Sequence, residues 1–307
     1  MSTPASASTT AGPAAGKTAL VVGGTNGIGR GIAHHLVKQG VSVTIVGRNK
    51  DKTEKVAQEI GASDWLLCDI HMQAQVTKLA EDVHGKHKHL DILVVTAGVL
   101  TKVKEMSPDG IELELVSNYL WRFQLTYLLR DLLAAAPHGA RVLNVAAAGQ
   151  NGQVHFDDYN FEKPGNPWAV FKASSQAMQL GDVFTVEAQR RWGSLGNGIA
   201  FHITFPGQVN TRTGSEFFAA LPAWVAIIFT ILIPLKKTLA QSGEEHAPLL
   251  LGQLGEQGGK LWKGTMTGFG IGLTELTPNP HVANDREFAA KCWDFSKSLF
   301  KVPLPNE

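Results

Sequence analysis

The sequence predicts an α/β fold in which a single parallel sheet is covered by helices on both faces. From Thr18 onward, short runs that are apolar throughout alternate with longer amphipathic runs. Uniformly apolar strands are typical of a sheet buried on both faces, and the amphipathic runs supply the connecting helices. A glycine-rich turn joins the first apolar run to the first amphipathic one. We therefore expect one doubly wound domain, three layers thick, over residues 17–307.

Six strands and five helices are expected to alternate up to residue 207. The strands are predicted at 18–24, 41–48, 64–70, 90–98, 141–149 and 198–207. The helices are predicted at 30–40, 51–62, 73–85, 112–136 and 172–192. Glycines at the ends of the first two helices are typical stop signals.

Composition narrows the class of protein. The chain is 44% hydrophobic and 18% charged, which is ordinary for a water-soluble globular protein. A net charge of +1 argues against nucleic acid and against electrostatic binding to an anionic membrane. Cys68 and Cys292 cannot form a disulfide framework, which favours the reducing cytoplasm. Residues 1–16 are small and uncharged, so we expect a disordered tail.

An apolar segment interrupts the strand–helix rhythm after the sixth strand. Residues 217–235 carry no charge, and their length reaches the lower limit for a membrane span. Two prolines disfavour such a span, and the fold continues afterwards. We expect residues 211–245 to form a helical lid over an apolar substrate pocket. A peripheral contact of 217–235 with a membrane surface is left open.

The glycine-rich turn predicts a dinucleotide site of the Rossmann type. The run GGTNGIG, residues 23–29, follows a strand and opens a helix. Such glycines let the backbone approach a pyrophosphate, and the helix start offers N–H donors. Arg48, beside Asn49 at the end of the second strand, stands where an acidic residue would bind the ribose of NAD. A guanidinium suits the 2′-phosphate of NADP(H), so we expect that cofactor.

From these motifs the sequence resembles the short-chain dehydrogenase/reductase family. The resemblance rests on the turn, on CDI at 68–70, on TAG at 96–98, on Asn118 and on FPGQVNT at 205–211. It implies a set of cofactor-binding residues along the carboxyl ends of the strands. They are Gly23, Thr25, Asn26, Gly27, Ile28, Gly29, Arg48, Asn49, Asp69, Ile70, Ala97, Gly98, Lys172, Pro206, Gly207, Val209 and Thr211.

Within the family, the sequence looks like the retinol-dehydrogenase-like branch. The segments FDDYNFEKPGNPW at 156–168 and NDREFAAKCWDFSKSLF at 284–300 carry this likeness. The branch implies a hydrophobic small-molecule substrate and frequent association with membranes. The family resemblance also implies a homodimer or homotetramer.

The expected catalytic set departs from the family pattern. The family uses a Tyr as general acid, a Lys four residues later and a Ser that orients the substrate oxygen. Here Lys172 is identified with the lysine, Trp168 takes the Tyr position, and Ala147 or Ala146 takes the Ser position. Asn118 is identified with the helix asparagine that supports the lysine. An indole is a donor that does not titrate, and alanine offers no polar group.

These replacements make ordinary ketone reduction by the family mechanism doubtful. A cationic iminium needs no proton when it accepts hydride, whereas a conjugated C=C needs a replacement acid. Asp158 is the first candidate acid, because a partly buried Asp can have a raised pKa. His155, Asp157 and Tyr159 are the alternatives, and a structural role for each is the competing interpretation. Trp168 either forms an apolar or cation–π wall for the substrate or fills space.

The leading hypothesis is an NADP(H)-dependent oxidoreductase with an atypical active site, acting on a hydrophobic small molecule in specialised metabolism. The alternative is a non-redox protein on the same scaffold, either a dinucleotide-binding pseudoenzyme or a cyclase or isomerase. The histidine-rich run at 84–89 reads as a surface loop, and no metal site is expected.

Overall fold

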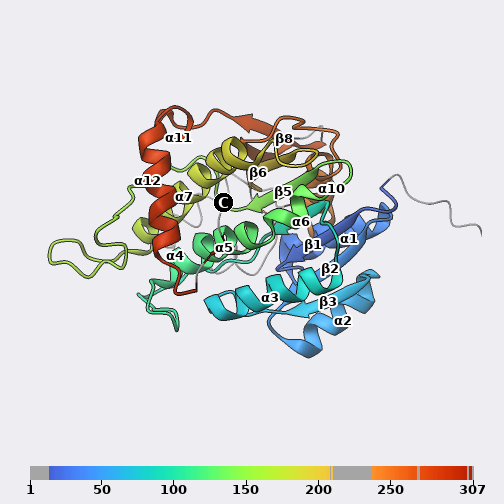
Figure 1. The fold of residues 1–307 in the computed structure, drawn as a ribbon, viewed down its shortest axis with the longest axis horizontal. Coiled ribbons are helices and arrows are strands. Elements are labelled where there is room, and N and C mark those ends of the chain that lie inside the picture. Colours follow the sequence, from blue (N-terminus) through green and yellow to red (C-terminus); the bar gives the residue numbers. More distant parts are fainter. Residues whose placement is uncertain (1–13, 208, 210–236, 268–269, 303, 306–307) are drawn as a thin grey trace, which may run out of the picture.

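The computed structural model describes residues 14–207, 209, 237–267, 270–302 and 304–305. Within these residues, one sheet of eight strands has the order β3-β2-β1-β4-β5-β6-β7-β8, and only β8 runs antiparallel (Figure 1). The strands are β1 Thr18–Val22, β2 Ser42–Gly47, β3 Asp64–Leu67, β4 Ile92–Val95, β5 Ala140–Val145, β6 Ile199–Phe205, β7 Lys260–Thr267 and β8 Gly270–Leu276. The six predicted strands and the doubly wound α/β class are confirmed.

The helices lie in two layers, one on each face of the sheet (Figure 1). They are α1 Gly27–Lys38, α2 Lys50–Ile60, α3 Gln73–Lys86, α4 Leu113–Leu115, η1 Val116–Leu120, α5 Trp121–Leu128, α6 Arg130–Ala134, α7 Val170–Trp192, α10 Leu239–Leu250, α11 Pro280–Ala283 and α12 Arg286–Ser298. Neighbouring residues of the strands point to opposite layers, so each strand contributes to two cores.

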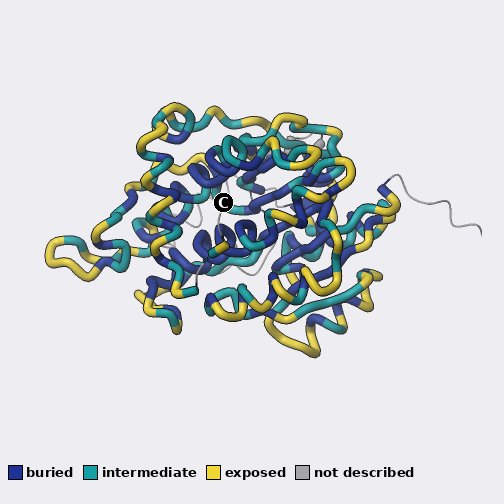
Figure 2. The backbone as a smooth tube through the Cα atoms, in the orientation of Figure 1, coloured by how far each residue is buried: buried dark blue, intermediate teal, exposed yellow. Residues whose placement is uncertain are grey.

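Two apolar cores fill the space between the sheet and the helices. Leu20 and Val22 of β1 join the core formed with α3, α5, α7 and α12. Ala19 and Val21 of the same strand join the core formed with α1, α2 and α10. Figure 2 shows both as buried backbone inside an exposed rim. This alternation explains why the strands are apolar at every position.

The structure does not contain the single continuous helix predicted at 112–136. The segment is divided into α4, the π-helical turn η1, α5 and α6. Asn118 lies within the π turn, and the Trp121 indole donates a hydrogen bond to the Ser117 carbonyl at 2.8 Å. Such π turns are rare inside α-helices and are found frequently at functional sites.

The predicted lid over residues 211–245 is not confirmed by the part that the structure describes. Residues 239–245 belong to α10, which packs against α1 rather than over a pocket. The contact is backbone to backbone, because a Cβ added to Gly31 would come within 2.0 Å of the Leu239 carbonyl oxygen. Residues 210–236, which include the apolar segment 217–235, lie outside the described residues.

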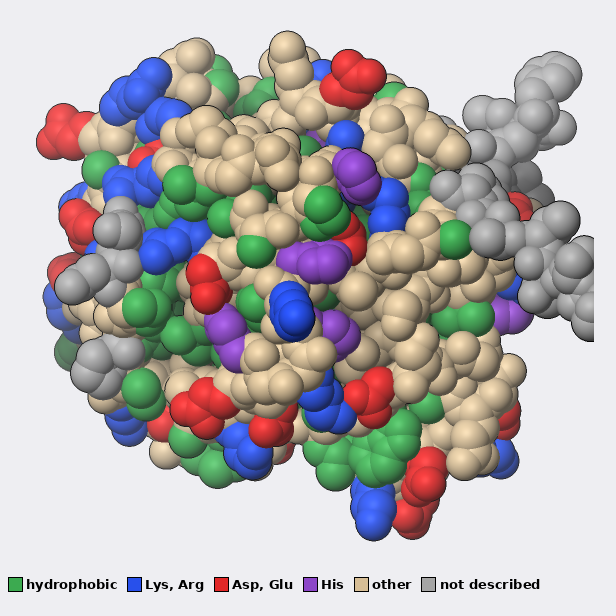
Figure 3. Space-filling view, turned by 45° about the vertical axis from the view of Figure 1, so that its right-hand side comes forward, with side chains coloured by type: hydrophobic (Ala, Val, Ile, Leu, Met, Phe, Trp, Pro, Cys, Tyr) green, Lys and Arg blue, Asp and Glu red, His purple; other side chains and the backbone are tan. Residues whose placement is uncertain are grey.

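Two further expectations concern the chain start and the membrane. Ala14 is buried, and its N–H donates to the Gln39 carbonyl at 3.1 Å, so the predicted tail does not extend through residue 16. Within the described part of the chain, no helix is long and apolar enough to cross a membrane. Basic and acidic side chains are interspersed on the face in Figure 3.

Candidate functional site

The glycine-rich turn fits tightly against the segment that follows β4. Gly23 has a φ of +88°, and a Cβ there would come within 2.5 Å of Thr96 Oγ1. A Cβ on Gly29 would come within 2.5 Å of the Gly23 carbonyl oxygen. Asn26 precedes α1 but makes no capping hydrogen bond through its side chain, and the first turn holds no acidic residue. The first N–H groups of α1 are thus free of a side-chain cap, as an approaching phosphate requires.

The flanking residues of the turn support its shape. The Thr25 methyl group lies 2.5 Å from where a Cβ on Gly47 would stand, so the turn rests on the end of β2. Ile28 packs against the apolar core between α1, α2 and the sheet. The residues from 23 to 29 therefore form one compact cradle at the carboxyl end of β1.

Arg48 follows β2 directly and is exposed. Among the described residues its guanidinium is found in no ion pair. Asn49 has a structural task, because its Oδ1 accepts a hydrogen bond from the Lys52 N–H at 2.9 Å and caps α2. Asp69 accepts from the His71 N–H at 3.1 Å, and Ile70 packs on the core. The parallel register of β2 and β3 brings the ends of both strands to the same edge.

Ala97 and Gly98 bring the chain against the π turn. The Ala97 carbonyl accepts a hydrogen bond from Arg122 at 2.8 Å. A Cβ on Gly98 would come within 2.5 Å of Asn118 Oδ1, so only glycine allows this approach. Asn118 is buried, and its Nδ2 donates to the Val99 carbonyl and to Glu114 Oε2, each at 2.8 Å. The asparagine is thereby fixed at the carboxyl end of β4.

The segment after β6 is held by a buried ion pair. Lys237 Nζ donates to the Pro206 carbonyl at 2.9 Å and pairs with Glu245 at 2.5 Å. Gly207 has a φ of +70°, and Val209 forms a parallel bridge with Lys237. Thr211 lies outside the described residues.

Trp168 is anchored rather than free. Its indole N–H donates to Glu112 Oε1 at 2.9 Å, and the Glu112 carboxylate is completely buried. The indole is itself half-buried. Its one polar group is engaged, so Trp168 presents apolar ring surface and no proton donor.

Lys172 has its hydrogen-bond partner in the loop before its helix. Its Nζ donates to Asn166 Oδ1 and lies 5.3 Å from the centre of the Phe161 ring. Since α7 begins at Val170, Lys172 lies in the first turn and reaches toward the loop before the helix. The ammonium is therefore held by the 155–168 loop, and its contact with the nicotinamide ribose stays a prediction.

Asp158 also differs from its expected role. Its carboxylate accepts hydrogen bonds from the Asn166 side chain and from the backbone N–H groups of Glu162 and Lys163. The Asn166 bond in particular lowers the pKa of Asp158, against the opposing effect of burial. A general acid needs a raised pKa, so the Asp158 carboxylate has a structural role: its hydrogen bonds hold the loop together.

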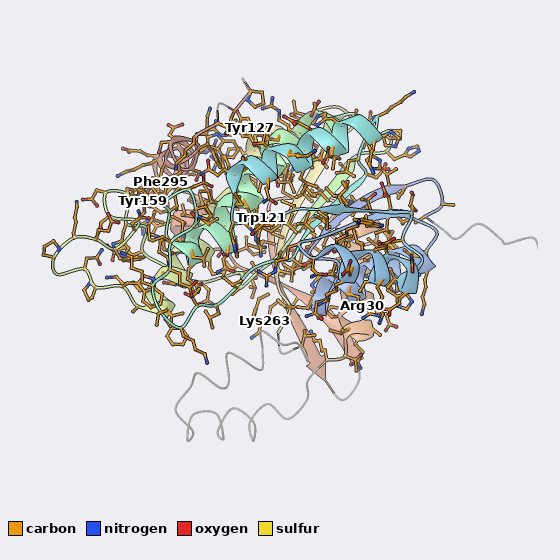
Figure 4. All side chains as sticks on the ribbon, turned by 90° about the horizontal axis from the view of Figure 1, so that it is seen from below. Arg30, Trp121, Tyr127, Tyr159, Lys263 and Phe295 are labelled. Atoms are coloured by element: carbon orange, nitrogen blue, oxygen red, sulfur yellow. The ribbon has the colours of Figure 1, made fainter. Side chains whose placement is uncertain are left out.

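The alternative acids lie in similar structural settings. Burial lowers the pKa of His155, and the Tyr159 ring packs edge-on against Phe295 of α12 at 5.6 Å (Figure 4). Asp157 is exposed and paired with Lys163. None of the three is joined to Asn118 by a hydrogen bond among the described residues.

The residues that do gather around Asn118 include three that sequence reasoning missed, which are Glu114, Ser174 and Met178. Ser174 Oγ donates to Glu114 Oε2 at 2.7 Å, and the same oxygen accepts from Asn118. Met178, one helical turn beyond Ser174, lines a small cavity with Asn118 and Ala146. The Ala147 N–H faces the Met178 sulfur at 3.4 Å. Glu114 escaped notice because a charged residue on a helix is ordinarily taken as solvent-exposed.

Comparisons with known proteins place this arrangement in a family. The model of the short chain dehydrogenase family matches residues 17–220. Polyprenol dehydrogenase of Homo sapiens is 31% identical over 218 residues, which cover 68% of this chain and 65% of the relative. Retinol dehydrogenase 13 of Homo sapiens is 28% identical over 304 residues, covering 95% of this chain and 86% of the relative. The chain belongs to the short-chain dehydrogenase family.

This membership confirms the predicted oxidoreductase class and the retinol-dehydrogenase-like branch. Solved structures show the same fold at lower identity. An uncharacterised protein from Mycobacterium paratuberculosis has a TM-score of 0.69 at 21% identity, covering 95% of this chain and 96% of its own. A variant of actinorhodin polyketide ketoreductase that holds NADPH has a TM-score of 0.60 at 20% identity, covering 80% of this chain and 95% of its own.

Proposed function

We propose that this protein is an NADP(H)-dependent oxidoreductase that transfers hydride to a hydrophobic small molecule. The acceptor is an iminium or a conjugated C=C rather than a simple ketone. The observation that carries the proposal is a dinucleotide cradle of family form beside a catalytic helix with no Tyr at its start. The names of the relatives, which refer to polyprenol and retinol, support a lipophilic substrate.

The residues present fit the cofactor. The cradle at 23–29 suits a pyrophosphate, and the exposed Arg48 suits a 2′-phosphate. Asp69 and Ile70 lie at the edge suited to the adenine, and Ala97, Gly98 and the Pro206–Gly207 turn flank the remaining path. When bound, NADPH supplies hydride.

The protein's own groups restrict which acceptor is reduced. A ketone gains negative charge on oxygen and needs an acid in direct contact, whereas an iminium becomes a neutral amine without one. Trp168 offers ring surface near the start of α7, which suits an apolar or cationic substrate. A hydrophobic iminium satisfies both conditions, whereas a hydrophobic enone also needs a replacement acid to protonate the product. Specialised metabolism is the setting that we propose for such a substrate.

The test is a screen of wild-type protein with NADPH. It would compare a hydrophobic cyclic iminium, a hydrophobic enone and a ketone of the same carbon skeleton, following nicotinamide absorbance. We expect turnover of the iminium and the enone, with the ketone at least 10²-fold slower because it lacks a directly positioned acid. Tight NADPH binding without turnover of any acceptor would instead favour the dinucleotide-binding pseudoenzyme.

Three companion expectations stay proposals. We propose a homodimer or homotetramer, which light scattering of purified protein tests. We propose a cytoplasmic location. We also propose contact with a membrane surface through 217–235, which a vesicle sedimentation assay would detect.

A further inference from the structure

The buried carboxyl group of Glu114 stands out at the candidate site. Its side chain is fully buried, and its partners are Thr101, Asn118 and Ser174. None of these partners carries a charge. Burying an ionised carboxylate without a cation is costly, and such a group ordinarily keeps its proton instead.

The electrostatic surroundings act in the same direction. Burial raises the pKa of Glu114, and the negative charge of neighbouring Glu112 raises it further, while the hydrogen bonds from Thr101 and Ser174 oppose the shift. Glu112, at the start of α4, is the charged group that raises the pKa of Glu114. The contacts from η1 and α7 come from the uncharged side chains of Asn118 and Ser174. A raised pKa is what a proton-donating carboxyl group requires near neutral pH.

Ser174 connects this buried group to a less buried position. The Ser174 side chain is only partly buried, and its hydroxyl both donates and accepts. It stands on α7 one turn before Met178, which faces the cavity beside Asn118. The cavity is lined by Asn144 and Ala146 at the carboxyl end of β5 and by Ile203 of β6, and in open α/β sheets ligands bind outside the carboxyl ends of the strands.

We propose that the Ser174 hydroxyl, backed by the buried carboxyl group of Glu114, is the proton donor to the reduced substrate. This inference rests on the proposed function and extends it. With an enone, hydride forms a C–H bond at the β-carbon, and the electrons of the C=C bond pass to the α-carbon and its carbonyl. The α-carbon takes the proton of Ser174 Oγ, and Ser174 Oγ takes the proton of Glu114 Oε2. For this step the Ser174 hydroxyl turns toward the substrate, and its oxygen accepts from the protonated Glu114 carboxyl group along the same 2.7 Å contact. The Glu114 carboxylate then regains a proton from water.

Two variants test the relay against two acceptors. Ser174→Ala removes the hydroxyl, and Glu114→Gln keeps the shape and removes the acidic proton. Both are expected to lower enone turnover about 10²- to 10⁴-fold. Both should keep iminium turnover and NADPH affinity near the wild-type values, because neither needs the proton. Ser175→Ala is the matched control, since the Ser175 hydroxyl bonds to the Lys172 carbonyl at 3.1 Å instead.

A spectroscopic measurement separates proton donation from a structural role. The infrared carbonyl band of a protonated carboxylic acid should be present near neutral pH in wild-type protein and weaker in Glu114→Gln. Equal loss of enone and iminium turnover, or enone turnover unchanged in Ser174→Ala, would overturn the relay while leaving the reductase intact. Wild-type protein inert toward both acceptors would overturn the proposed function, and the relay with it. If Glu114→Gln fails to fold, the two-acceptor comparison with Ser174→Ala still decides.

Discussion

The two halves of the molecule are stabilised in different ways. In the dinucleotide half, from β1 to β4, close backbone contacts through glycines shape the turn, and Asp91 is the one buried charged side chain among the described residues of this half. In the catalytic half, charged side chains enter the interior. Buried ones are Glu112, Glu114, Arg122, Asp158, Asp182, Glu187, Lys237 and Glu245. The stability of the dinucleotide half therefore depends on glycines that let backbone segments approach closely. The stability of the catalytic half depends on the pairing and protonation of buried ionisable side chains.

This difference teaches where substitutions should do most harm. A buried charge that loses its partner costs more than a crowded turn, and both cost more than a surface charge. The folding stability of the catalytic half therefore depends strongly on a few buried ionisable residues.

The largest expected effect comes from the ion pair behind the Pro206 turn. Lys237→Met would leave Glu245 buried without its ammonium partner. We expect a loss of about 3–5 kcal/mol in the free energy of unfolding, measured by urea denaturation. The matched control is Lys55→Met, which breaks an exposed pair with Glu59 and should cost less than about 1 kcal/mol. Equal costs for the two variants would remove the contrast between the halves.

A smaller effect is expected in the dinucleotide turn. Gly29→Ala places a methyl group against the Gly23 carbonyl, where the backbone cannot give way easily. Overpacking of about 1–3 kcal/mol corresponds to a roughly 10- to 100-fold loss of NADPH affinity by fluorescence titration. Gly85→Ala in α3 is the control, because nothing lies within 4 Å of the added methyl group. NADPH affinity unchanged in Gly29→Ala would show that the turn does not hold the pyrophosphate.

The smallest effect is a change in pH dependence at Asp182. Burial raises the pKa of this carboxyl group to about 8, against hydrogen bonds from the backbone N–H groups of Gly149 and Gln150. A folded-state pKa above the unfolded value stabilises the fold at acid pH, and that contribution is lost as pH rises toward 8. Asp182→Asn should abolish this loss and be more stable than wild type above pH 8, as measured by urea denaturation at a series of pH values. Parallel stability curves for the two proteins between pH 5 and about 9 would contradict it.

Much of the fold follows from the sequence, because strands buried on both faces leave an unbroken apolar signal. The hairpin of β7 and β8 escaped prediction, since glycines and threonines dilute that signal from Gly264 to Gly272. The break at η1 also escaped, because a π turn keeps a helix-like pattern of apolar residues. The sequence does not indicate that α10 packs on α1 through Gly31 and Gly243, since close backbone contacts depend on tertiary structure.

The site was predictable to the extent that backbone determines it. Gly23, Gly29 and Gly98 are glycines for steric reasons that a motif conveys. The spacing from Trp168 to Lys172 matches the family pattern, whereas the partner of the Lys172 side chain, Asn166, depends on the fold of the loop before α7, which spacing does not convey. Glu114 could not be identified, because its role depends on burial beside Ser174, and burial of a charge has no local sequence signal.

The most direct test of the intact dinucleotide site is a fluorescence titration of wild-type and Arg48→Ala proteins with NADPH and NADH. Charge-assisted hydrogen bonds to a phosphate predict a loss of about 1.5–3 kcal/mol, or roughly 10- to 100-fold, in NADPH affinity for the variant. NADH affinity should be unchanged, and wild-type protein should prefer NADPH. Binding of neither nucleotide by wild-type protein, or equal affinity for both that Arg48→Ala leaves unaltered, would contradict an NADP(H) site.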